Sequence, residues 1–137
     1  MAYVSQERKK QLTPGIKAVL AKYGMRATIG VRHHSTLVVR ITQGPLDLIG
    51  DVNTVNATLS RDMGREYQPV KTYFDVNEYH IDRFHSGKCR DFLNELHDAM
   101  MVGNHDNSDP MTDYFDVGWY TDIRVGAWDK PYQYTGA

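Results

Sequence analysis

The chain has 137 residues, of which 41% are hydrophobic and 24% are charged. This length suits one domain with its own core, and the composition is that of a globular protein rather than a disordered segment or a coiled coil. We therefore expect residues 1–137 to form a single domain. The formal net charge of −1 excludes an overall positive field that would draw the protein to nucleic acid or anionic lipid. Nucleic-acid binding would require a local basic patch.

Cysteine usage and the first residues of the chain bear on location. Cys89 is the only cysteine, which excludes an internal disulfide and a zinc site built from several cysteines of one chain. Residues 1–12 lack the apolar core of a signal peptide. No window holds the roughly 20 apolar residues that a membrane-spanning helix needs. These features predict a cytoplasmic protein without a membrane partner.

Two helix start signals lie near the N-terminus. Ser5 can cap a helix that begins at Gln6. Thr13-Pro14 supplies a second start, because proline at the first helical position has no hydrogen bond to lose. This pattern predicts a short helix, a break and a second helix that ends at Gly24. The apolar stripe of the second helix consists of Leu12, Ile16, Val19, Leu20 and Tyr23.

A hairpin is expected next, because residues 27–33 and 37–42 alternate and are rich in Ile, Val and Thr. Their apolar residues share one face if His33 pairs with Leu37, which leaves 34–36 as the turn and points His33 toward the core. The opposite face has little bulk and is expected to meet solvent. It carries Thr28, Gly30, Arg32, Val38, Arg40 and Thr42.

The middle of the chain is less regular. Residues 43–68 show no clean period, so a short helix and a long loop both remain open. Residues 70–76 alternate and predict a third strand, after which Asn77 caps a helical turn through Phe84. A second core helix is expected over residues 87–101. Its apolar side consists of Cys89, Phe92, Leu93, Leu96, Ala99 and Met100.

A fourth strand is expected over residues 117–125, with Trp119, Thr121, Ile123 and Val125 facing inward. The tail after Gly126 is expected to lie across the sheet through Trp128 and Tyr132. Together the elements predict an α+β fold: a single layer of mostly antiparallel sheet, with about four strands, packed against two main helices.

The polar run 104–109 is the first candidate site. Imidazole and carboxylate groups in a short loop can hold a divalent metal, with His105, Asp106 and Asp109 as candidate ligands. The sequence GNHD is similar to the asparagine–histidine motif of calcineurin-like metallophosphatases, but no aspartate-x-histidine element precedes it. A loop of turns and caps is the other interpretation. No other cofactor is expected.

The remaining candidates are spread along the chain. His34 is the freer histidine of the hairpin tip, and nothing around Ser35 resembles a nucleophile elbow. Cys89 lies on an apolar stripe and is expected to be inert. Tyr120 points outward beside Arg124 on the fourth strand. The sequence thus offers no catalytic set, and its candidate binding residues are Arg32, His34, Asn104, His105, Asp106, Asp109, Tyr120 and Arg124.

Two long segments carry a resemblance to a known family. They are TPGIKAVLAKYGMRATIGVRHHSTLVVRI and GNHDNSDPMTDYFDVGWYTDIRVGAWDKPY, which together make up most of the chain expected to be ordered. They resemble small proteins of tailed bacteriophages that are related to the large polyvalent protein-associated domains. That family has no established activity, so the resemblance implies a setting: the cytoplasm of an infected bacterium, where small phage proteins act on host processes or defences by binding.

The first functional hypothesis is therefore non-catalytic binding to a host or phage macromolecule or to a nucleotide-like ligand, in host takeover or counter-defence. The alternative is a metal-dependent phosphoester hydrolase that uses His105, Asp106 and Asp109 with a histidine of the hairpin. A third and less favoured hypothesis is nucleic-acid binding through Arg32 and Arg40 on the open side of the hairpin.

Overall fold

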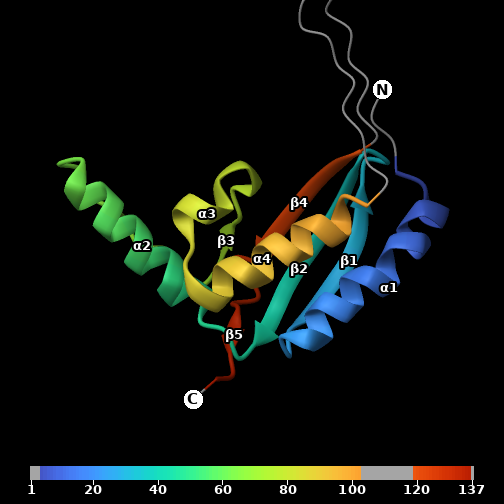
Figure 1. The fold of residues 1–137 in the computed structure, drawn as a ribbon, viewed down its shortest axis with the longest axis horizontal. Helices are drawn as coiled ribbons and strands as arrows, with labels where there is room; N and C mark the ends of the chain where they lie inside the picture. Colours follow the sequence, from blue (N-terminus) through green and yellow to red (C-terminus); the bar gives the residue numbers. More distant parts are fainter. Residues whose placement is uncertain (1–3, 103–118, 137) are drawn as a thin grey trace, which may run out of the picture.

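The computed structural model describes residues 4–102 and 119–136, which form a mixed sheet with helices packed against it (Figure 1). The α+β prediction is confirmed. In chain order the elements are α1 (Gln6–Lys22), β1 (Arg26–Arg32), β2 (Thr36–Gly44), α2 (Leu48–Asp62), β3 (Phe74–Asp75), the 3₁₀ turn η1 (Glu78–His80), α3 (Ile81–Phe84), α4 (Gly87–Met100), β4 (Tyr120–Val125) and β5 (Gln133–Tyr134).

The sheet has the strand order β1-β2-β4-β3. The β1–β2 and β3–β4 pairs are antiparallel, whereas β2 and β4 run parallel. The short strand β5 pairs with the far end of β2. Strand β2 is therefore central, and β1 lies at one edge.

The core lies between the sheet and two helices. Helices α1 and α4 pack side by side against one face, with α4 in front of the strands in Figure 1. Among the described helices, none is both long and apolar enough to cross a membrane. The inward faces of β2, β4, α1 and α4 supply most of the core, including Leu37, Val39, Ile41, Ile123, Val125, Leu12, Ile16, Leu20, Phe92, Leu93, Leu96 and Met100.

The hairpin has the predicted faces but a different register. Val31 pairs with Leu37 and Arg32 with Thr36, so the predicted pairing of His33 with Leu37 is wrong by two residues. A slip of two preserves the faces because side chains alternate with a period of two. The turn contains His33 and His34 in the left-handed region, with φ of 53° and 57°. His33 is exposed there and does not point toward the core.

Helix α1 is continuous, contrary to the predicted break. Pro14 lies inside it and removes one backbone donor, while the neighbouring Thr13 hydroxyl donates to the Lys9 carbonyl at 2.7 Å. Burial of the stripe on both sides of Pro14 holds the helix together. The predicted ends are confirmed: Ser5 Oγ accepts from the Arg8 amide, and Gly24 has φ of 69°.

The segment left open by the sequence contains α2, and the strand predicted over 70–76 is reduced to the two residues of β3. Val70 is held outside the ladder by the Asn53 side chain. The Asn53 amide accepts from the Val70 amide and the Tyr67 hydroxyl, each at 2.9 Å, and donates to the Val70 carbonyl at 2.8 Å. An alternating pattern cannot distinguish a strand from a loop tethered in this way.

Of the two aromatic residues predicted to pack the C-terminal tail across the sheet, only one is buried. Tyr132 is buried, and its hydroxyl donates to the Leu46 carbonyl at 2.6 Å. Trp128 is 79% exposed, so it does not lie across the sheet as expected. The tail turns at Gly126, and this places only one of the two aromatic rings against the core.

Candidate functional site

The described residues include half of the candidate binding set. Arg32, His34, Tyr120 and Arg124 are described, whereas Asn104, His105, Asp106 and Asp109 lie outside the described residues. Within residues 4–102 and 119–136, no group of three or more His, Cys, Asp or Glu side chains could hold a metal ion. The metal site and the hydrolase hypothesis that depends on it stay predictions.

The sheet face opposite α1 and α4 brings three of these candidates together. We call this surface the open face. Pairing aligns Arg32 with Thr36 and Thr36 with Tyr120, so Arg32 and Tyr120 lie on the same face of a row that crosses three strands. Arg124 lies on this face too, directly opposite Arg40 of β2. His34 is on the adjacent turn, where its side chain is exposed.

Ion pairs order part of the open face. Asp122 Oδ2 lies 3.0 Å from both Arg32 Nη1 and Arg124 Nε. Arg124 Nε also lies 3.8 Å from Asp75 Oδ1. The hydrogen bond to Asp122 raises the pKa of Arg124, which stays charged. One carboxylate thus fixes two guanidinium groups in place.

Arg40 is a residue of the open face with a hydrogen-bond donor that the described residues leave unsatisfied. Its Nε is buried and has no hydrogen-bond partner among the described residues. Its cross-strand neighbour on the same face is another arginine, Arg124, and like charges in such pairs destabilise a sheet. Arg40 therefore combines an unsatisfied donor with an unfavourable neighbour. The sequence placed Arg40 on this face but not in the main candidate set.

A shallow hollow of about 280 Å³ lies among these side chains. Gly30 contributes to it, because a Cβ at that position would have nothing within 4 Å. We call it the arginine hollow, and its side-chain lining includes Thr28, Arg32, Val38, Arg40 and Arg124. The hollow is open to solvent and predominantly positive, which suits a small anionic group.

Tyr120 marks the other end of the open face. Its side chain is 53% exposed, and its amide donates to the Ser35 carbonyl at 2.8 Å, which fixes β4 beside the hairpin tip. Arg124 lies four positions after Tyr120, or about 13 Å along an extended strand. A ligand that stacks a flat ring on the Tyr120 side chain and places an anion in the arginine hollow must therefore be longer than a single phosphate group.

Glu78 is a second unusual group, beside β4, and the sequence did not single it out. Its Oε1 is buried without a hydrogen-bond partner in the described part of the chain. Burial raises the pKa of this carboxyl from 4.5 to about 7, with a further contribution from Asp122 and an opposing hydrogen bond with Thr121. Only the residue type, not its burial, was visible in the sequence.

Replacing Glu78 with glutamine is expected to stabilise the protein near neutral pH. Because the folded-state pKa lies above the ordinary value, the carboxyl favours folding below about pH 4.5 and loses that contribution as the pH rises through about 7. Glu78→Gln should therefore raise the free energy of unfolding by about 2–3 kcal/mol near pH 8 and by little near pH 4. Urea unfolding across this range measures the difference.

The matched control for that experiment is Glu66→Gln at an exposed glutamate. It should change the free energy of unfolding little at either pH. An equal response of the two variants would show that the burial of Glu78 has no energetic effect.

The other potentially reactive side chains lie in environments that do not activate them for catalysis. Burial raises the pKa of the Cys89 thiol to about 12, so the thiol stays protonated at neutral pH, in keeping with inert packing. His85 is also enclosed, with 3% of its surface exposed. Burial lowers the pKa of His85, and nearby Asp51 opposes this effect. The Ser86 hydroxyl donates to Asp51 rather than to a histidine, so these residues do not form a nucleophile–base pair.

Comparison with known proteins adds no assignment to this geometry. The sequence matches no protein-family model, and neither a curated protein nor a solved structure matches the chain.

Proposed function

We propose that the protein is a small accessory protein that acts by non-catalytic binding, and that the open face of its sheet binds a phosphate-bearing, nucleotide-like ligand. The setting implied by the phage resemblance is an infected bacterial cell, in which such binding would serve host takeover or counter-defence. The observation that carries the proposal is the pair of arginines, Arg40 and Arg124, side by side over an open hollow.

An anion in the arginine hollow would accept from the exposed parts of its guanidinium groups; the Arg32 and Arg124 side chains are 43% and 31% exposed. It would also offset the unfavourable contact between Arg40 and Arg124, which costs a few tenths of a kcal/mol to about 1 kcal/mol. Guanidinium groups in this arrangement match the oxygens of a phosphate.

Tyr120 extends the recognition beyond phosphate. An exposed ring on an open sheet face is a platform on which a base can stack, and stacking contributes about 1–3 kcal/mol per base. Single-stranded nucleic acid presents both a phosphate and a base at the required separation, whereas inorganic phosphate presents only the first. The overall charge of −1 makes any such binding depend on this local patch.

Fluorescence anisotropy with a labelled single-stranded oligothymidylate of roughly ten nucleotides tests the proposal. Arg40→Gln should weaken binding about tenfold and reduce the dependence on salt, because one phosphate contact is lost. The melting temperature of the variant should not fall, since an unpartnered donor is removed. Arg90→Gln, at an exposed arginine of α4, is the charge-matched control and should bind as the unaltered protein does.

Competition separates the possible sources of the ligand. Tyr120→Ala should weaken oligonucleotide binding but leave competition by inorganic phosphate unchanged. A mononucleotide that competes as well as the oligonucleotide identifies a nucleotide site rather than a strand-binding surface. Equal affinity of Arg40→Gln and the unaltered protein for every probe would reject the open face as the site.

A further inference from the structure

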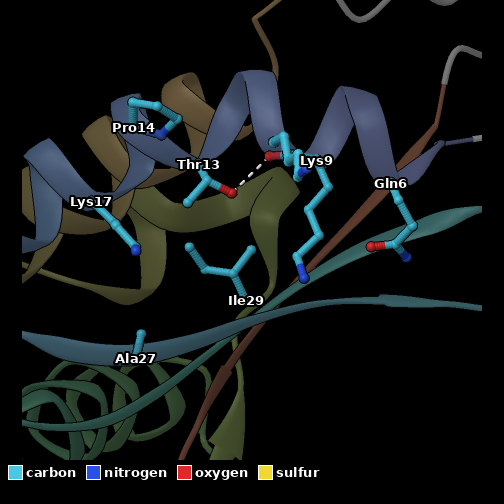
Figure 2. A pocket seen from close by; sticks show the side chains of 8 residues that line it. Gln6, Lys9, Thr13, Pro14, Lys17, Ala27 and Ile29 are labelled. Atoms are coloured by element: carbon cyan, nitrogen blue, oxygen red, sulfur yellow. Dashed lines mark hydrogen bonds between the residues drawn. The ribbon is translucent and has the colours of Figure 1, made fainter.

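A second surface lies at the edge of the sheet, away from the open face. A groove of about 630 Å³ separates α1 from β1. Its helix wall carries Lys9, Lys10 and Lys17, and its strand wall carries Ala27 and Ile29. Figure 2 shows Lys9 and Lys17 pointing from α1 toward the strand, with Ile29 rising between them. We call this surface the edge groove.

The edge groove exists because β1 is only partly covered. Ala27 and Ile29 face the same side of the sheet as Ile41 and Val39, their partners on β2. Those partners are 0% exposed, whereas Ala27 and Ile29 are only half-buried. The apolar side of β1 therefore keeps accessible surface beneath the lysines.

The outer edge of β1 pairs with no other described strand, and it runs beside the edge groove. The Ser35 carbonyl, just before β2, accepts from the Tyr120 amide of β4, and the Ile41 carbonyl accepts from the amide of Gly126, just after β4. Odd-numbered residues of β2 therefore direct their backbone groups toward β4, and even-numbered ones toward β1. By the antiparallel register, Ala27, Ile29 and Val31 must then direct their amides and carbonyls outward. Among the described strands, β1 pairs with β2 alone.

Charge restricts what can occupy this edge. The lining of the edge groove includes no acidic residue. Within residues 4–102 and 119–136, its three lysines form no ion pair. Pairing of β1 with β1 of a second copy would bring two sets of lysines together. An acidic strand would instead meet complementary charge.

We propose that an extended acidic segment of a partner protein binds by adding a strand to the outer edge of β1. Its backbone pairs with Ala27, Ile29 and Val31, as in other complexes formed by strand addition. Every second side chain enters the edge groove, where carboxylates contact Lys9 and Lys17 and the methylene groups that carry them rest on Ile29. This site is separate from the arginine hollow and does not depend on the function proposed for it.

Calorimetric titration of the full chain with a synthetic peptide of alternating valine and glutamate, about eight residues long, tests the binding. Lys9→Gln combined with Lys17→Gln should weaken it about tenfold. A peptide of alternating valine and lysine should not bind. Arg40→Gln should leave the affinity for the acidic peptide unchanged, which separates this test from that of the open face.

Hydrogen exchange tests the geometry. The acidic peptide should slow exchange of the Ala27, Ile29 and Val31 amides, while Thr28 and Gly30 are already protected by β2. Val31→Pro removes one outward donor at an edge position and should weaken binding without changing the lysines. Circular dichroism checks that this variant folds.

Three outcomes would overturn the inference. Binding without slower exchange at these amides would mean that the lysines attract acidic chains without strand addition. No binding of the acidic peptide would remove the site. A dimer whose β1 amides are protected without peptide would assign the edge to a second copy of the chain.

Discussion

Replacing Gly126 with alanine is expected to lower the free energy of unfolding by about 3 kcal/mol or more. Gly126 has φ of 67°. A Cβ there would lie 2.7 Å from the Tyr132 nitrogen and 2.8 Å from the Thr72 oxygen. These two atoms are hydrogen-bonded to each other at 2.9 Å, so the methyl group would push apart a backbone bridge that no side-chain rotation can relieve.

Gly64→Ala provides the control for that variant. Gly64 has a similar φ of 70°, but a Cβ there would have no atom within 4 Å. Its cost should be about 1 kcal/mol, from backbone conformation alone. Urea unfolding of both variants measures the difference, and equal losses would show that the close approach at Gly126 is unimportant.

Replacing Asp51 with alanine is expected to cost about 3 kcal/mol, because this carboxylate of α2 joins the start of α4. Asp51 Oδ2 accepts from the Ser86 amide at 3.1 Å, and Oδ1 accepts from the Ser86 hydroxyl. The His85 imidazole lies 3.3 Å from the same carboxylate without a formed hydrogen bond. The Asp51 side chain is only 12% exposed, so water cannot readily replace these contacts.

Asp47→Ala is the matched control for Asp51→Ala. Asp47 caps the same helix by accepting from the Gly50 amide at 2.9 Å, and its removal should cost about 1 kcal/mol. Thermal and urea unfolding compare the two variants. If both lose the same stability, the contact between Asp51 and α4 contributes nothing beyond an ordinary helix cap.

The alternation of residue types in the hairpin was enough to predict its faces but not its register. Side-chain alternation states which residues share a face, and it placed Arg32 and Arg40 on the open side. The register depends on the turn, where His33 and His34 adopt left-handed backbone angles. Nothing in their residue type requires those angles, so the two-residue shift was not predictable.

The sequence also predicted only part of the candidate site. Tyr120 and Arg124 were expected to point outward from their own strand, and they do. That Arg124 faces Arg40 depends on the parallel pairing of β4 with β2, which local patterns do not reveal. Trp128 shows the same limit: an apolar ring in a tail predicts burial, but the turn at Gly126 directs it into solvent.

The position of β2 has a consequence for how the protein folds. Its antiparallel partner β1 precedes it by one tight turn, whereas its parallel partner β4 follows only after α2, β3, α3 and α4. Closing that long loop costs more chain entropy than closing the hairpin, so the hairpin should form early and the β2–β4 ladder late. Because Arg40 and Arg124 belong to different sides of this ladder, the open face is completed only in the final stage of folding, and partly folded chains should lack it.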